Sequence, residues 1–295
     1  MKLRIVHATT YEYADPVTTS HHGVHLTPRS GDGQVCISHE LTVAPLPRSV
    51  YERTDYFGNQ ARSFSLHEPH RSLRIVATSE VLRDDRRQLS LSPRSPSWED
   101  VRDRLARDRR PDALAAYGLT FASRYVRPDG ELREYALPSF PPGRPLLEAA
   151  RDLTRRIHAE FNYEPGATDI STPLSEVLRQ RRGVCQDFAH LEIGCLRALG
   201  LPGRYVSGYL MTTPPPGKAH VFGADASHAW VSAYLPGAGW IDYDPTNACF
   251  VAAGHIVIAR GRDYSDVSPV KGLSSGGGGH ALQTGVTVEL ADQAV

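Results

Sequence analysis

One helix in the middle of the chain constrains the fold more than any other segment. The sequence CQDFAHLEIGCLRAL has an apolar face formed by Phe188, Leu191, Cys195, Leu196 and Leu199. Gly200 supplies the left-handed residue that ends a helix, and Pro202 blocks its continuation. Strand-like segments RYVSGYL, HAWVSAYL and WIDYDP follow, and PGAG turns the chain between the last two. This order predicts helices packed on an antiparallel sheet.

Further helices are predicted just upstream. LLEAARDLTRRIHAEF carries apolar residues at helical spacing from Leu146 to Phe161, and Thr172 with Pro173 marks the start of a short helix. We place this helix-and-sheet core at residues 145–262. A C-terminal extension, residues 263–295, loosens at SSGGGGH and ends on one expected strand, GVTVEL.

The N-terminal third has a different pattern. Residues 1–85 contain β-rich, partly alternating segments bounded by Gly, Pro, Asp and Asn, including a hairpin expected around Gly58. They predict an all-β, sandwich-like domain. Residues 86–144 are polar or Pro-rich and are interpreted as a linker with one short helix near SWEDVRDRLARD. The fold class expected for the whole chain is α+β.

Charge and hydrophobicity exclude several classes of partner. Lys+Arg and Asp+Glu balance at 33 each, so no excess charge favours nucleic acid or an anionic membrane. No stretch approaches the ~18 apolar residues that a membrane-spanning helix needs. The N-terminal sequence alternates apolar and polar residues and lacks the apolar region of a signal peptide, so we expect a cytoplasmic protein.

The four cysteines are too few and too scattered for a disulfide framework, and none forms a CxxC pair. Most of the 13 histidines are isolated in the sequence. No acidic loop resembles DxDxDG, the pattern of a calcium site. We therefore expect no metal and no cofactor.

Cys185 follows Gly183 and Val184 and opens the central helix. The free N–H groups and partial positive charge of a helix N-terminus stabilise a thiolate and could also bind an oxyanion. The alternative is that Cys185 is only a small buried residue. Cys195, which lies on the apolar face of the same helix, fits that alternative well.

Two further residues could complete a thiol-based site. His228 begins a predicted strand, and imidazole can act as a base toward the thiol and as an acid toward a leaving amine. Asp244 ends the next strand, where a carboxylate could hold the imidazole tautomer. Asp242 lies two residues away on the same face and competes for that role.

Three ordered blocks carry a family resemblance: GVCQDFAHLEIGCLRALGLPGRYVSGYL, SHAWVSAYL and GWIDYDPTN. Together they resemble the core of the transglutaminase-like superfamily, whose fold is related to that of papain-type thiol proteases. The resemblance covers about residues 145–260. Residues 1–85 resemble the N-terminal region of bacterial members, and GRDYSDVSPVKG resembles their C-terminal continuation.

The resemblance implies a role for each residue of the set. Cys185 would be the nucleophile, His228 the base and Asp244 the third member, which favours Asp244 over Asp242. Tyr163 is either an oxyanion donor, a cleft aromatic or a core tyrosine. Gln186 could contribute to oxyanion binding or orient substrate, while Asp187 could orient substrate or cap the helix. Trp230 is expected to pack beside His228.

The implied reaction is acyl transfer from an amide through a thioester on Cys185. With water as the second nucleophile the enzyme is a cysteine protease or amidase, which is the reading we favour. With an amine it is a transglutaminase or another amide-forming acyltransferase. A non-catalytic binding module and a zinc hydrolase are further alternatives. The substrate would be a peptide, a protein or a small amide, and the sequence leaves the oligomeric state open.

Overall fold

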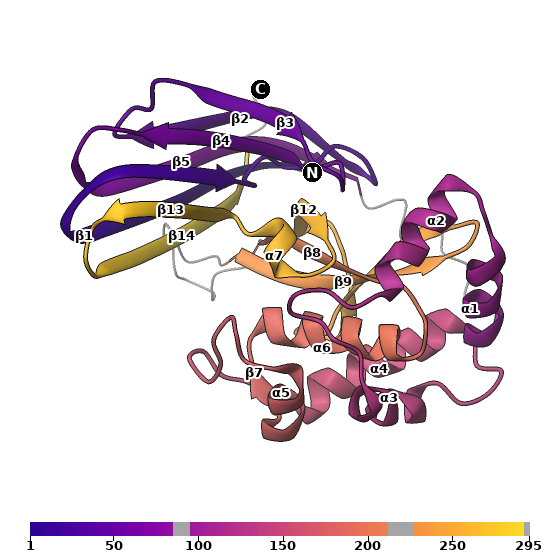
Figure 1. The fold of residues 1–295 in the computed structure, drawn as a ribbon. Coiled ribbons are helices and arrows are strands. Elements are labelled where there is room, and N and C mark those ends of the chain that lie inside the picture. Colours follow the sequence, from indigo (N-terminus) through magenta and orange to yellow (C-terminus); the bar gives the residue numbers. More distant parts are fainter. Residues whose placement is uncertain (85–94, 212–226, 292–295) are drawn as a thin grey trace, which may run out of the picture.

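The computed structural model describes residues 1–84, 95–211 and 227–291, and the polar start of the expected linker lies outside them. Figure 1 shows three layers: a curled N-terminal sheet, a five-stranded sheet beneath it, and helices on the far side of the second sheet. The predicted fold class, α+β with a papain-like core, is confirmed.

The curled sheet has seven strands, and the chain builds it from both of its ends. Its antiparallel order is β2-β5-β1-β4-β3, and β13 and β14 also pair with β1. The strands are β1 (Lys2–Val24), β2 (Gln34–Ala44), β3 (Val50–Thr54), β4 (Gln60–Leu66), β5 (His70–Arg83), β13 (Val270–Gly276) and β14 (His280–Leu290). The expected final strand is present within β14, and its pairing with β1 ties the C-terminal extension to the N-terminal domain.

Residues 95–144 contain more helix than the sequence indicated. In place of one short helix there are three, α1 (Trp98–Arg107), α2 (Pro111–Tyr117) and α3 (Gly130–Ala136), and two 3₁₀ turns, η1 (Gly118–Thr120) and η2 (Leu137–Ser139). Trp98, Leu132 and Phe140 are buried in the same hydrophobic cluster as the central helix. This segment therefore packs as part of the core.

The core itself follows the predicted order of elements. Its helices are α4 (Leu146–Glu160), α5 (Leu174–Gln180) and α6 (Cys185–Ala198), with the short turn α7 (Tyr264–Val267) after the sheet. The antiparallel order of the sheet is β11-β10-β9-β8-β12. Its strands are β8 (Gly203–Leu210), β9 (Ser227–Leu235), β10 (Gly239–Asp244), β11 (Cys249–Phe250) and β12 (His255–Gly261), and a parallel pair, β6 (Asn162–Tyr163) with β7 (Arg182–Gly183), lies apart.

The two faces of the five-stranded sheet pack against different partners. Tyr205, Val231 and Tyr243 share a hydrophobic cluster with residues of α6. On the other side, Tyr209, Ile256 and Ile258 cluster with Leu3, Ile5, Val81, Val286 and Val288 of the curled sheet. The two sheets are therefore joined by a continuous apolar contact. No helix in the described parts of the chain is long and apolar enough to span a membrane.

Candidate active site

Cys185 is the first residue of α6, and its side chain is half-buried. Asp187 folds back so that its Oδ2 accepts hydrogen bonds from the Val184 N–H at 2.8 Å and from the Thr168 hydroxyl at 2.6 Å. This caps the helix start. As in any α-helix, the first N–H groups of α6 have no acceptor within the helix. A Cβ at Gly183 would lie 2.6 Å from the same carboxylate oxygen, so glycine is required there.

His228, at the start of β9, meets Asp244, at the end of β10. His228 Nε2 lies 2.8 Å from Asp244 Oδ2, and both side chains are buried. The Cys185 thiol lies near enough to His228 to help raise the pKa of that imidazole. Because Nε2 faces the carboxylate, Nδ1 is the ring nitrogen that remains for the thiol. The structure thus brings Cys185 near His228, which itself contacts Asp244.

The charges of these groups depend on one another. Burial alone would lower the pKa of His228, but hydrogen bonds and negative charge from Asp244 and Cys185 outweigh it and raise that pKa to about 10. For Asp244, burial favours the neutral acid, yet hydrogen bonds from His228 and His255 prevail and hold its pKa far below the usual range. The pair therefore carries an imidazolium and a carboxylate at neutral pH.

Asp244 is held by more partners than the sequence suggested. Its Oδ2 contacts His255 Nε2 at 3.0 Å and Asn247 Nδ2 at 2.7 Å, and its Oδ1 accepts from the Thr246 and Asn247 N–H groups at 2.9 and 3.2 Å. Sequence reasoning missed His255 and Asn247. Asn247 stands in the DPTN block, but His255 is isolated in the sequence and only the pairing of β12 with β8 brings it to the site.

His228, Asp244 and His255 form the one group in the described residues whose ligand atoms are close enough together to hold a metal ion. The hydrogen bonds of His255 oppose that role. Its Nδ1 accepts from the Ala252 N–H at 3.3 Å, so the ring proton sits on Nε2 and points at Asp244. A nitrogen that donates a proton to the carboxylate has no lone pair for a metal.

Asp242 and Trp230 lie beside the pair. Trp230 Nε1 donates to Asp242 Oδ2 at 3.2 Å, and the Ser232 hydroxyl donates to Asp242 Oδ1. The Trp230 ring lies 6.0 Å from the ring of His228 and 5.3 Å from that of His255. Asp242 thus anchors the indole, while Asp244 contacts the catalytic candidate directly.

Tyr163 and Gln186 are both accessible to solvent. Tyr163, in β6, is 53% exposed and packs edge-on against Phe188. Burial raises the pKa of Tyr163, and Cys185 adds to that effect, so the phenol lies near the thiol. Gln186 follows Cys185 and is half-buried. Tyr163 is exposed too far to be a core tyrosine.

The other cysteines differ from Cys185 in their surroundings. Burial raises the pKa of Cys36 and Cys195, and raises that of Cys249 to about 11. Cys195 is fully buried on α6, as its place on the apolar face predicts. Among the four, Cys185 alone combines a helix N-terminus with a histidine partner.

Comparison with known proteins gives the chain a family context. It matches the model of the bacterial transglutaminase-like N-terminal region over residues 3–82 and that of the transglutaminase-like superfamily over residues 139–245. An uncharacterized protein of Mycobacterium tuberculosis is 43% identical over 92% of this chain and 87% of its own length. One of Mycobacterium leprae is 35% identical over 98% of both chains.

Two further similarities are more distant. A protein-glutamine gamma-glutamyltransferase of Pseudomonas aeruginosa is 31% identical over 123 residues, which are 35% of this chain and 18% of that protein. The crystal structure of a candidate cysteine protease from Cytophaga hutchinsonii has a TM-score of 0.76 at 24% identity, over 100% of this chain and 92% of that one. The similarity to the Cytophaga hutchinsonii structure is one of fold, and it includes both sheets.

Proposed function

The chain belongs to the transglutaminase-like superfamily, and from that premise we propose that it is a thiol-dependent enzyme that cleaves amide bonds. The observation that carries the proposal is the contact of His228 with the buried Asp244, with the Cys185 thiol at the start of α6 near the same imidazole. A thiol at a helix N-terminus, near an imidazole that a buried carboxylate contacts, supports the proposal. This is the arrangement that nucleophilic acyl transfer requires.

The first half of the reaction forms a thioester. The Cys185 thiolate attacks the amide carbon, and the carbonyl electron pair moves to oxygen. Free N–H groups at the start of α6 stabilise that oxyanion, with Gln186 and the Tyr163 phenol as further donors. The C–N electron pair then goes to the departing nitrogen, which takes its proton from the His228 imidazolium.

The second half releases the acyl group. His228, now neutral, removes a proton from water as the water oxygen attacks the thioester carbon. The C–S bond breaks, the product acid leaves and the thiolate is restored beside the imidazolium. Asp244 stabilises the charged imidazole in both halves without itself accepting a proton.

An amine can replace water in the second half, which would make the protein a transglutaminase or another amide-forming acyltransferase. The similarity to a protein-glutamine gamma-glutamyltransferase favours this second candidate, although it covers 35% of the chain. Both candidates use the same catalytic residues and take a peptide, a protein or a small amide as acyl donor. They differ in how well the cleft excludes water and binds an amine.

An activated ester tests the proposal without knowledge of the natural substrate. Incubation with p-nitrophenyl acetate should release a burst of nitrophenol and leave one acetyl group on Cys185, detectable by intact mass. Cys185→Ala should show neither signal. Acetylation spread over other residues, and equal in the Cys185→Ala variant, would contradict the assignment.

The same acetyl-enzyme separates the two candidates. After removal of excess ester, the enzyme is divided between buffer and buffer with cadaverine. Loss of the acetyl group as acetate in both portions supports a hydrolase. Transfer of most of it to cadaverine supports an amide-forming acyltransferase.

A further inference from the structure

A cavity of about 820 Å³ opens on the face of the five-stranded sheet opposite α6. Its volume lies within the ~300–1,000 Å³ of ligand pockets. Arg204, Trp240, Arg260, Tyr56, Phe57 and Leu119 contribute to its lining. Arg204 pairs in register with Ser232, four residues along β9 from His228, or about 13 Å at ~3.3 Å per residue. The cavity is thus separate from the candidate active site.

The arginines of this cavity differ in how they are neutralised. Arg260 lies 2.7 Å from an oxygen of Asp32, and Arg262 lies 2.8 Å from one of Asp266. For Arg204 no carboxylate lies within ion-pair distance in the parts of the chain that the structure describes. The cavity therefore contains one guanidinium without a direct counter-ion.

Arg204 also leaves much of its hydrogen-bonding capacity unused. Its Nε is buried and has no acceptor among the described residues, and its Nη2 makes one long contact, 3.4 Å, to the Ser232 hydroxyl. Burial lowers the pKa of Arg204 and the nearby Arg260 adds to that effect, while the carboxylates of Asp242 and Asp32 oppose it. A bound anion would supply the stabilisation that this cation lacks.

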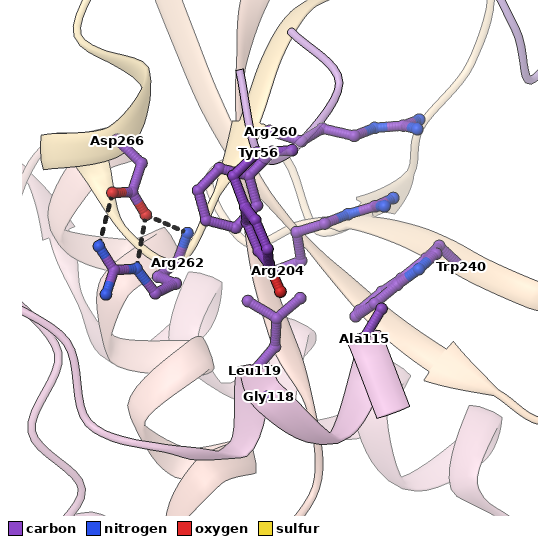
Figure 2. A pocket seen from close by; sticks show the side chains of 10 residues that line it. Tyr56, Ala115, Gly118, Leu119, Arg204, Trp240, Arg260, Arg262 and Asp266 are labelled. Atoms are coloured by element: carbon purple, nitrogen blue, oxygen red, sulfur yellow. Dashed lines mark hydrogen bonds and ion pairs between the residues drawn. The ribbon is translucent and has the colours of Figure 1, made fainter. Parts of the chain in front are cut away.

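The remaining walls are apolar or aromatic. The Arg204 guanidinium stacks on the Trp240 ring, with Cζ 4.2 Å from the ring centroid. Figure 2 shows Arg204 and Arg260 extended in the same direction, with the Trp240 ring beside Arg204 and with Tyr56 and Leu119 toward the backbone end of the arginine side chains. Tyr56 is 88% exposed, so its ring is available to a ligand.

We propose that this cavity binds an organic carboxylate with a flat apolar body. The carboxylate accepts from the terminal nitrogens of Arg204, whose planar fork fits it, and the body packs against Trp240, Tyr56 and Leu119. One unpaired guanidinium matches a single negative charge. The other two arginines are already neutralised by carboxylates, so a dianion such as phosphate is disfavoured.

The NMR signals of the indole N–H groups of the three tryptophans provide a direct test of carboxylate binding in the full chain. Trp98 does not line the cavity and donates to Pro141, so its signal serves as an internal control for that of Trp240. Titration with benzoate should move the Trp240 signal saturably, whereas benzamide, its neutral analogue, should not. Inorganic phosphate should bind at least tenfold more weakly than benzoate.

Substitution then connects binding to the arginine. Arg204→Met keeps the apolar stem against Trp240 and should weaken benzoate binding at least tenfold. Arg151→Met, which removes an exposed arginine stacked on Phe250 at 5.5 Å, should leave it unchanged. Equal binding by wild type and Arg204→Met would overturn the proposal.

The wild-type chain alone can also overturn it, should Arg204→Met fail to fold. Absence of saturation by benzoate, equal binding of benzamide, or phosphate binding as tight as benzoate would each contradict a site for an organic monocarboxylate.

Discussion

At the residue scale, the site depends on the field that Asp244 places on His228. Because His228 has a pKa raised to about 10, its imidazolium persists through neutral pH and is lost as pH rises past that value. The step in which His228 protonates the leaving nitrogen of an amide should therefore slow as the pH rises past the pKa of His228. Asp244→Asn removes the negative charge, which should lower the pKa of His228 by about 1–3 units.

This change is measurable as a displacement of the alkaline limb of the rate–pH profile toward lower pH. The profile of nitroaniline release from an acyl p-nitroanilide, whose leaving nitrogen needs the proton that His228 supplies, gives the displacement when it is taken for wild type and Asp244→Asn. An alkaline limb at the same pH in both proteins would show that Asp244 does not set the charge of His228.

His255 is expected to act through Asp244 and not on substrate. His255→Ala removes a donor from a buried carboxylate, a loss of about 1.5–3 kcal/mol, and should slow Cys185 alkylation about ten- to a hundredfold. His255→Gln, which can still donate to Asp244, should recover part of the rate. His39→Ala, which removes a histidine of the curled sheet, should leave the rate as in wild type.

A purely structural role for His255 predicts a different outcome. Its variants would then lower the melting temperature while the alkylation rate of the folded protein stayed unchanged.

At the scale of elements, close packing around β8 fixes the Trp230 indole beside the candidate active site. A Cβ at Gly208 would lie 2.1 Å from the Ile256 carbonyl oxygen and 2.4 Å from the Trp230 ring. Gly208→Ala should therefore destabilise the protein by about 1–3 kcal/mol, as overpacking does. Denaturant unfolding measures this, with Gly130→Ala as control because a Cβ at Gly130 meets nothing within 4 Å. Equal stability of the two variants would contradict the packing argument.

The sequence predicted the elements that carry the candidate catalytic residues because their patterns are local. Apolar spacing identified α4 and α6, and the left-handed residue Gly200, with φ +75°, ends α6 as expected. α1 was predicted too, as the short helix near SWEDVRDRLARD, whereas α2 and α3, of seven residues each, were not: Ala113, Ala116 and Leu132 are among their apolar residues buried against other elements. Helices held mainly by such distant contacts carry a weak signal of their own.

Contacts between distant segments explain what the sequence missed. His255 reaches Asp244 only after β12 has paired with β8, and no spacing along the chain encodes that pairing. The cavity around Arg204 likewise combines the hairpin after β3 with strands nearly 150 residues later in the sequence. The motifs predicted which residue types could act together. Which distant residues lie next to one another is seen only in the folded chain.

At the scale of the whole molecule, the C-terminal strands join the two sheets. Val288 is fully buried in the cluster shared by the curled sheet and the five-stranded sheet, whereas Leu290 is 62% exposed. Val288→Ala should lower the free energy of unfolding by about 2 kcal/mol through the cavity it leaves. Leu290→Ala should change it by no more than about 0.5 kcal/mol.

Both layers should respond together to Val288→Ala, because the cluster belongs to both. Tryptophan fluorescence, which reports on the core, and far-ultraviolet circular dichroism should show coincident transitions. Two separated transitions in the wild-type protein would contradict a single cooperative unit.

The most direct test of the central claim is the rate at which each cysteine reacts with iodoacetamide at neutral pH. Intact mass followed by peptide mapping should find one fast site, Cys185, in the wild-type chain. Labelling should disappear in Cys185→Ala and slow in His228→Ala, because the imidazole supports the thiolate. Labelling led by Cys36 or Cys249, or an unchanged rate in His228→Ala, would contradict the account.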